Sequence, residues 1–363
     1  MSLVVVFGSL LAALVLVILI MATAWTVLRR RYRLSTPADE RHRAPTDDGW
    51  EIALYRYRPA AFTPGREPVL LCHGMLSNRF NVDLDATRSI ARYLRDGGFD
   101  VWIMELRGHG GSRRTGAGGR RWSGWTIDDY IQRDVVAAMR TVRHLTGAET
   151  LHWYGHSMGG MILYAACADP GMAGSIRSAA LSDAPSTFRP LRREGIDVRA
   201  ARFWGRFVPV VPPALVLPFL GPIVWLHPRL MDRRYGLSDR ALVMRLLSNA
   251  IVSWGSSGVL LHLLDMIESG RFRSRDGERD YEGGADNIVF PLLVLSAARK
   301  LMDEEAVLSG YRRAPAEKKR YVRFSRANGY SVDYTHSNLM LSDGSSREVY
   351  PEILDWFLAH SSA

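Results

Sequence analysis

Ser157, which lies between Gly155 and Gly159, is the residue of this sequence whose surroundings best suit nucleophilic chemistry. A short strand-like run at 151–156 precedes it, and a run of small and apolar residues typical of a helix begins at Met158. The spacing fits the G-x-S-x-G elbow, a sharp turn that leaves a serine Oγ exposed. Both glycines are needed because a side chain would crowd so tight a turn. An ordinary glycine-rich turn between a strand and a helix is the alternative interpretation.

A serine hydroxyl becomes a good nucleophile only when a base takes its proton and a third group orients that base. Among the ten histidines, His336 follows the last expected strand by a short loop and precedes the terminal helix, so we predict that it is the base. His156 is adjacent to the serine and points elsewhere, so we expect it to pack or to orient other groups. His109 lies in a turn after an earlier strand, where it would line the pocket.

We predict that Asp303 is the acid that orients the base. It lies eight residues past Leu295, in a loop from which a carboxylate could reach the imidazole. Glu304 and Glu305 are alternatives in the same loop, and Asp183, at the end of the preceding strand, is the main rival. We therefore expect substitution of Asp303 to reduce turnover more than substitution of Asp183.

Acyl transfer also needs hydrogen-bond donors for the oxyanion, each commonly worth ~3 kcal/mol of the barrier. The backbone N–H of Met158, directly after the serine, is one expected donor. The backbone N–H of Met75, which follows a strand end at His73-Gly74, is the other. An ordinary strand-to-loop turn is the alternative at Met75.

The elements that must position these groups follow an α/β pattern. Strands are expected at 50–57, 68–72, 100–105, 151–156, 176–182, 288–295 and 320–324, with helices at 89–95, 127–145 and 346–360. Strands that alternate with helices at this spacing predict a mostly parallel sheet flanked by helices. The predicted catalytic core therefore comprises residues 49–183 and 286–363.

Between the late strands, residues 184–285 break the alternation. Helix-like stretches occur near 239–250 and 258–268, and several prolines exclude one long helix. We expect a helical cap inserted into the core. Its richness in Leu, Val, Phe, Trp and Pro suits an apolar ester, although simple packing on the sheet would use the same side chains.

The amino-terminal segment, residues 3–28, contains no charged residue and is followed by four arginines within residues 29–33. Twenty-six helical residues would extend about 39 Å, enough to cross a ~30 Å hydrocarbon layer. We predict an uncleaved transmembrane anchor, a basic and polar linker at 29–48, and a catalytic domain on the cytoplasmic side. A cleaved secretory signal, with Ala22-Thr-Ala24 as its cleavage site, is the alternative.

Composition narrows the range of partners. The formal net charge is +10, yet the 47 basic residues are dispersed and form no basic stripe interleaved with aromatics, which argues against nucleic acid. Anionic membrane lipid suits this charge better. Cys72 and Cys167 lie in apolar segments, and no cluster has zinc-ligand spacing, so we expect neither a metal nor another cofactor.

These motifs, in this order, resemble the α/β-hydrolase superfamily, and most closely its lipase and esterase members. The likeness rests on His73-Gly74, the turn 107–112, the Ser157 elbow, the loop of Asp303, and His336, and it covers roughly residues 50–360. It implies an α/β-hydrolase fold with Ser157, Asp303 and His336 as nucleophile, acid and base. The sequence departs from the pattern at Glu105, where many members carry aspartate, and at Ala297-Ala298, where a glycine often precedes the acid loop.

The expected function is hydrolysis of carboxylic esters, with a lipid or another hydrophobic acyl ester as substrate. A serine nucleophile argues against dehalogenases and epoxide hydrolases, which resemble this fold but use aspartate. It also argues against polyester synthases, which use cysteine. Two alternatives stay open: a membrane-bound acyltransferase with the same triad, and a non-catalytic binding protein of this fold.

Overall fold

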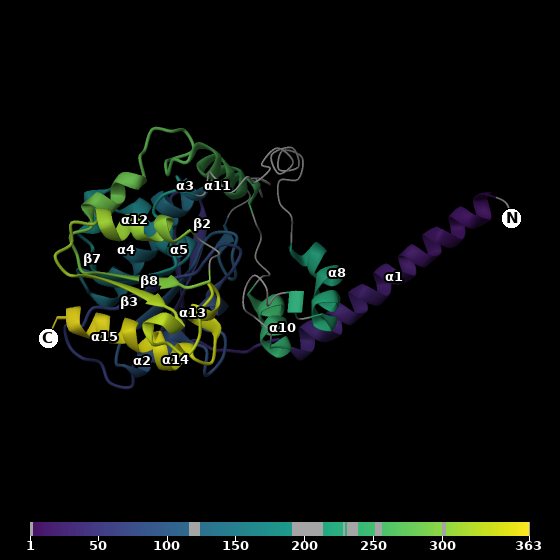
Figure 1. Cartoon of the computed structure of the whole chain (residues 1–363), viewed down its shortest axis with the longest axis horizontal. Helices are drawn as coiled ribbons and strands as arrows, with labels where there is room; N and C mark the ends of the chain where they lie inside the picture. Colours follow the sequence, from purple (N-terminus) through teal and green to yellow (C-terminus); the bar gives the residue numbers. More distant parts are fainter. Residues whose placement is uncertain are drawn as a thin grey trace.

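A central β-sheet with helices on both faces forms the main body of the protein, and a long amino-terminal helix extends away from it (Figure 1). The computed structural model describes residues 3–115, 124–190, 213–227, 229–230, 239–250, 256–299 and 303–362.

Within these residues, nine strands form one sheet in the order β1-β2-β4-β3-β6-β7-β8-β9, with β5 paired to β2. All pairings from β4 to β9 are parallel, whereas β2 runs antiparallel to its neighbours. The carboxyl ends of β3, β6, β7 and β8 therefore meet at one edge. The strands are β1 (Glu40–Pro45), β2 (Trp50–Tyr57), β3 (Val69–Cys72), β4 (Val101–Glu105), β5 (Arg113–Arg114), β6 (Leu151–His156), β7 (Ile176–Ser182), β8 (Leu292–Ala297) and β9 (Lys319–Phe324).

The sheet separates two apolar cores, because successive side chains of a strand point to opposite faces. Leu70 and Cys72 of β3 pack on one face, under α3, α4, α5, α11 and α12. Val69 and Leu71 pack on the other, under α2, α13 and α15. Since both faces are covered, β3 and β4 are fully buried and read as continuous apolar runs.

The helices bounding these cores are α1 (Leu3–Arg31), α2 (Ile90–Asp96), α3 (Ile127–Asp129), α4 (Val135–Thr146), α5 (Met158–Ala166), α6 (Pro170–Ala173), α8 (Pro213–Leu226), α10 (Arg240–Asn249), α11 (Ser257–Ser269), α12 (Glu304–Arg313), α13 (Asn338–Leu341), α14 (Ser345–Glu348) and α15 (Tyr350–His360). Short turns complete them: η1 (Arg79–Asn81), the π-helical η2 (Tyr130–Asp134), η4 (Glu282–Asn287) and η5 (Arg326–Asn328).

The predicted fold class is confirmed: the structure is an α/β-hydrolase fold with helices inserted between β7 and β8 and one apolar amino-terminal helix. The inserted helices among the described residues are α8, α10, α11 and η4. By length and composition alone, α1 could cross a membrane.

The predicted linker at 29–48 needs a correction, because residues 40–45 form the edge strand β1. The sequence Glu-Arg-His-Arg-Ala-Pro is too polar to show strand periodicity, since most of its side chains stay accessible at the sheet edge. Pairing with β2 is what makes it a strand, and the Glu40 carboxylate lies 3.2 Å from the Arg56 guanidinium across that pair. The expected helix at 127–145 is likewise divided by η2, and the terminal helix is divided between α14 and α15.

A buried cluster of ion pairs connects the turn after β4 with η2 and with the segment that precedes β2. Arg107 is almost completely buried, and its guanidinium lies 2.7 Å from the Asp134 carboxylate and 2.6 Å from that of Asp48. Asp134 is fully buried, whereas the side chain of Asp48 is 27% exposed. A charge buried this deeply depends on its partners, because it has no water to replace them.

We therefore expect Asp134→Ala to destabilise the protein by about 3–5 kcal/mol, the cost of leaving a buried charge without its main partner. The matched control is Asp48→Ala, which removes a partly exposed partner of the same arginine and should cost about 1 kcal/mol. Urea unfolding of the detergent-solubilised protein measures both. Equal losses for the two variants would contradict the assignment of Asp134 as the main partner.

Candidate active site

Ser157 lies at a strained turn between β6 and α5. Its backbone has φ 55° and ψ −118°, a conformation that L-residues rarely adopt, and the residue is nearly buried. Its N–H donates to the carbonyl of Ser182 at the end of β7, at 2.8 Å. The turn therefore has the geometry of a nucleophile elbow, as the spacing of its glycines predicts.

The elbow requires glycine because it is pressed against neighbouring backbone. A Cβ at Gly159 would lie 2.3 Å from the carbonyl oxygen of Cys72, at the end of β3. A Cβ at Gly155 would lie 2.5 Å from the backbone nitrogen of Gly160. Neither neighbour is a flexible side chain that could move aside, so only glycine fits at either position.

His336 and Asp183 form a buried pair beside this turn. The imidazole Nδ1–H of His336 donates to Asp183 Oδ2 at 2.5 Å, and both side chains are less than a tenth exposed. The other carboxylate oxygen accepts from the backbone N–H of Ala297, at the end of β8, at 3.2 Å. With Nδ1 engaged and oriented, Nε2 is the nitrogen left to take a proton from the serine.

The structure corrects the expected position of the acid. The carboxylate of Asp303 caps α12, where it accepts from the backbone N–H of Glu305 at 2.8 Å. The loop after β8 instead meets the His336 loop at Arg299, whose backbone N–H donates to the carbonyl of Tyr334 at 3.0 Å. The carboxylate that meets His336 is therefore that of Asp183.

The two alternative acids are also engaged elsewhere. The carboxylate of Glu304 lies 3.1 Å from the hydroxyl of Tyr321 and 3.0 Å from the guanidinium of Arg323. That of Glu305 forms an exposed ion pair with Arg312. Both carboxylates belong to the surface of α12 and β9.

Strand register explains why Asp183 takes this place. In the parallel pair β6–β7, His156 is opposite Ser182, so Ser157 and Asp183 each follow a paired residue. They emerge side by side at the same sheet edge. The order of strands across the sheet is decided by tertiary packing, so the sequence alone left Asp183 as the rival.

The two expected oxyanion donors lie in segments that border the serine. Met158 is the first residue of α5, so its N–H has no acceptor within the helix. Met75 follows Gly74, where a Cβ would lie 3.3 Å from the Cβ of Ser157. The loop after β3 therefore passes directly beside the nucleophile, and the oxyanion role of both N–H groups stays a prediction.

Backbone strain gathers at this site. Among the described residues, the non-glycine residues with positive φ are Leu76 at 55°, Ser157 at 55° and Asp183 at 48°. Leu76 follows Met75, Ser157 is the candidate nucleophile, and Asp183 is the carboxylate paired with His336. Such conformations cost free energy and persist only where the surroundings enforce them, and they are typical of catalytic sites.

Asparagine and histidine side chains hold the loop after β3, and the asparagines were not among the predicted site residues. Asn81 Oδ1 accepts from the backbone N–H of Gly74 and lies 3.1 Å from Nδ1 of His156. The opposite nitrogen of His156 lies 3.1 Å from the carbonyl oxygen of His336. His156 therefore orients its neighbours, as expected. Nothing in the spacing of Asn81 distinguishes it from other asparagines.

Two further histidines, His109 and His73, form hydrogen bonds with backbone groups in and next to the same loop. His109 Nδ1 lies 2.5 Å from the carbonyl of Ser77, and His73 Nε2 accepts from the backbone N–H of Leu106 at 3.2 Å. Burial lowers the pKa of His109 to about 4 and that of His73 to about 3, so both are neutral at pH 7. His109 therefore supports the loop by hydrogen bonding and is 98% buried, which differs from the expected pocket-lining role.

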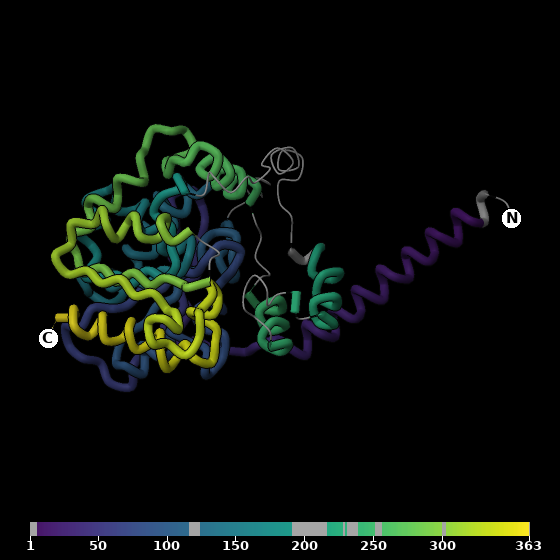
Figure 2. The backbone as a smooth tube through the Cα atoms, in the orientation of Figure 1, coloured from purple at the N-terminus to yellow at the C-terminus, as the bar shows by residue number. Residues whose placement is uncertain are grey.

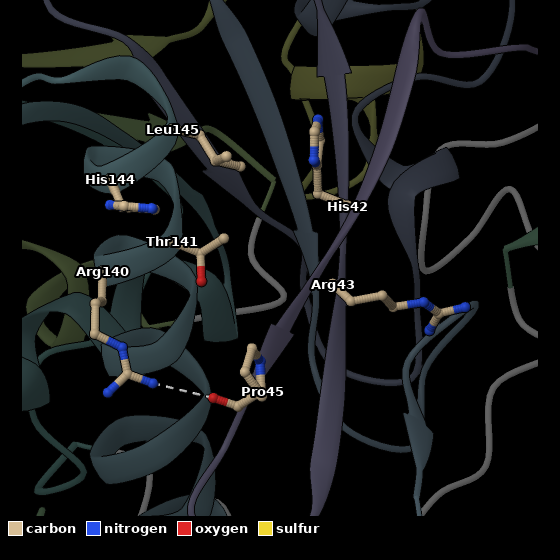
Figure 3. A pocket seen from close by; sticks show the side chains of 7 residues that line it. All are labelled: His42, Arg43, Pro45, Arg140, Thr141, His144 and Leu145. Carbon is tan, nitrogen blue, oxygen red and sulfur yellow. Dashed lines mark hydrogen bonds between the residues drawn. The ribbon is translucent and has the colours of Figure 1, made fainter.

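A surface pocket of about 480 Å³ lies elsewhere, between β1 and α4 (Figure 3). Three of its polar side chains have partners: His42 lies against Glu40, Arg43 against the carbonyl of Gly111, and Arg140 against the carbonyl of Pro45. The three catalytic candidates are not among its lining residues. Within the described part of the chain, no group of three or more His, Cys, Asp or Glu residues is placed to hold a metal ion.

Comparison with known proteins identifies the family. A family model described as the alpha/beta hydrolase fold matches residues 67–328, which is more than half of the chain. The chain belongs to the α/β-hydrolase family. Its elbow, its mostly parallel sheet and the buried acid–histidine pair agree with this membership.

Among curated relatives, Triacylglycerol lipase 2 of Arabidopsis thaliana is 33% identical over 152 residues, which are 39% of this chain and 36% of the relative. Human Lysosomal acid lipase/cholesteryl ester hydrolase is 31% identical over 129 residues, 33% of this chain and 32% of the relative. The chain thus covers about a third of the length of these relatives.

Solved structures of this α/β-hydrolase fold cover much more of the chain. A putative aryl esterase from Burkholderia cenocepacia aligns over 88% of this chain and 99% of its own, with a TM-score of 0.54 and 17% identity. A bacterial membrane phospholipase A aligns over 98% of this chain and 97% of its own, with a TM-score of 0.52 and 18% identity. At these identities the likeness shows the shared fold.

We expect Asp183→Asn to lower kcat about 10³–10⁴-fold, because an amide no longer holds the imidazole in the productive tautomer or stabilises its protonated form. The control is Asp303→Asn, which should leave kcat within about 2-fold, since asparagine caps a helix as well as aspartate does. Steady-state hydrolysis of a p-nitrophenyl ester measures both. The opposite ranking would return the acid role to Asp303.

The buried histidines make stability depend on pH. Since the pKa of His109 is about 4 when folded and near 6.5 when unfolded, its neutral form contributes stability above pH 6.5. This contribution is lost as the pH falls from 6.5 towards 4, by about 1.4 kcal/mol per pH unit. His109→Gln should make the free energy of unfolding fall less steeply over this window. Indistinguishable slopes for the wild type and His109→Gln would refute the assignment.

Proposed function

We propose that this protein hydrolyses carboxylic esters with hydrophobic acyl groups, through an acyl-enzyme on Ser157. The observation that carries the proposal is the buried Asp183–His336 hydrogen bond beside the strained serine. The names of the relatives, which are lipases and a cholesteryl ester hydrolase, support the ester class.

In the proposed mechanism, Ser157 Oγ attacks the ester carbonyl carbon while His336 Nε2 takes the hydroxyl proton. Asp183 stabilises the resulting imidazolium, and the N–H groups of Met75 and Met158 receive the oxyanion. The tetrahedral intermediate collapses, and the alcohol leaves with the proton from His336. Water, deprotonated by the same histidine, then attacks the acyl-enzyme and releases the carboxylic acid and the free serine.

The membrane is the proposed location of this chemistry. The exposed, apolar α1 ends in Arg29, Arg30 and Arg31, which favours an anchor with the catalytic domain on the cytoplasmic side. A secretory signal cleaved after the Ala22-Thr-Ala24 motif would end just before the buried Trp25, and it remains the alternative to an anchor.

Anchoring favours a lipid or a similar apolar ester as the substrate. A bilayer concentrates such molecules next to an anchored site. The bacterial membrane phospholipase A that shares this fold aligns over nearly the whole chain, which supports a lipid ester. A water-soluble ester would gain nothing from this arrangement.

We expect a fluorophosphonate probe to label the wild-type protein and to leave Ser157→Ala unlabelled, because only an activated serine reacts with it. Ser331→Ala, at an exposed serine, is the matched control and should label normally. A folded wild type that does not label would contradict the hydrolase and leave a binding protein.

A series of p-nitrophenyl esters of increasing chain length tests the substrate class in the same preparation. We expect kcat/KM to rise with acyl length, and an optimum at acetate would contradict a lipid substrate. Adding an acceptor alcohol separates the two fates of the acyl-enzyme. A transferred ester as the main product would identify an acyltransferase.

A further inference from the structure

The helix α8 has an apolar surface that the described residues of the protein leave uncovered. It contains no charged residue over its 14 positions. Leu217, Gly221 and Val224, spaced four and three residues apart, form its buried face. The opposite face is equally apolar and 41–59% exposed at Val216, Phe219, Leu220, Ile223 and Leu226. A helix that is apolar all round requires an apolar surrounding on every side.

The buried face of α8 packs on α1. A Cβ at Gly221 would lie 2.3 Å from Cε3 of Trp25, so the glycine lets the two helices approach closely. Figures 1 and 2 show α8 beside the end of α1 that is nearer to the catalytic body. Val27 and Ile20 of α1 are exposed as well, at 60% and 57%. The uncovered face of α8 thus continues the apolar surface of α1.

Length and flanking residues indicate how deep α8 would lie. Fourteen helical residues extend about 21 Å, too short to cross a ~30 Å hydrocarbon layer. Trp25 lies one helical turn before Arg29 in α1, and the guanidinium of Arg240 lies 5.1 Å from the Trp225 ring. Tryptophan and arginine are typical of the boundary between hydrocarbon and headgroups.

We propose that α8 inserts beside α1 into the leaflet nearest the catalytic domain, with lipid acyl chains covering its exposed face. This inference rests on the proposed role of α1 as a membrane anchor. Pro218 and Pro222 fit such a position, because helices in membranes tolerate proline where neighbouring segments satisfy the freed carbonyls. In this position α8 holds the helical cap at the bilayer, where a hydrophobic ester would be dissolved.

Hydrogen bonds connect this membrane-facing unit to the catalytic loop. At the end of α10, which packs on both α1 and α8, the Asn249 side chain binds the carbonyl of Tyr32 and the N–H of Leu34, each at 2.9 Å. The Asn249 carbonyl accepts from the Asn78 side chain at 2.7 Å. Asn78 lies in the loop that carries the expected oxyanion donor Met75. These hydrogen bonds therefore link the helices proposed to lie in the membrane, through α10, to the loop beside the site that would receive the ester.

Fluorescence quenching in vesicles tests the proposal on the full-length protein. The single variants Leu220→Cys, Val15→Cys and Leu145→Cys are labelled with bimane, since both native cysteines are buried. Each protein is reconstituted into phosphatidylcholine vesicles that contain lipid with a doxyl quencher at acyl carbon 5 or 12. Iodide in the buffer serves as the aqueous quencher.

For Leu220→Cys we expect at least 3-fold stronger quenching by 5-doxyl lipid than by iodide. The label at Leu145, which is 41% exposed on α4 like Leu220 on α8, should respond to iodide alone. The label in the middle of α1, at Val15, should respond best to 12-doxyl lipid. Quenching of the Leu220 label by iodide would overturn the proposal. Quenching by neither agent would also overturn it, because a second copy of the protein would then cover this face of α8.

The Val15 label separates this proposal from the one beneath it. If Val15 is quenched by 12-doxyl lipid and Leu220 is not quenched by lipid, α1 is an anchor and the insertion of α8 is wrong. If Val15 responds to iodide, the anchor itself is wrong. A second measurement uses the double variant Phe219→Glu, Ile223→Glu, which should lose several-fold in hydrolysis of a vesicle-dissolved ester and keep hydrolysis of a short soluble ester.

Discussion

The hydrogen bond from the Ser157 N–H to the Ser182 carbonyl, 2.8 Å long, is the contact on which the geometry of the site depends. It extends the parallel pairing of β6 and β7 one step past the strands, just where both chains turn away. Because β6 and β7 end at the same level of the sheet, Ser157 and Asp183 lie side by side. Both residues have positive φ. The adjacent end of β8 then donates the Ala297 N–H to the carboxylate, so three neighbouring strands orient one acid.

The remaining loops are held by neutral polar side chains instead of charges. His73, His109 and His156, together with Asn81, supply hydrogen bonds to the backbone around Gly74 and His336. Neutral groups suit this position because an uncompensated buried charge would compete with the charges that develop during catalysis. These histidines stay neutral in the folded protein, whereas an unfolded chain binds protons at them below about pH 6.5. Acidification should therefore destabilise the fold before the carboxylates are protonated.

The amino-terminal helix and the inserted helices belong to one assembly in this structure. Trp25 packs against α8, and Asn249 binds the chain just after α1 and the loop beside the nucleophile. If α1 is the membrane anchor that we propose, this connection would fix the height and orientation of the cap at the bilayer.

The sequence by itself determined the chemistry that is written into local spacing. The glycines around Ser157, the alternation of strands and helices and the uncharged run before Arg29 each depend on neighbours a few residues away, so they could be predicted directly. The prediction of His336 as the base came from its place after the last strand. Only the tertiary structure decided which carboxylate meets this histidine, because Asp183 and Asp303 both follow strands that end at the same edge. The order of strands puts Asp183 beside Ser157, whereas the carboxylate of Asp303 caps α12. Strand β1 and Asn81 were equally invisible in the sequence, since their roles come from partners that folding alone brings to them.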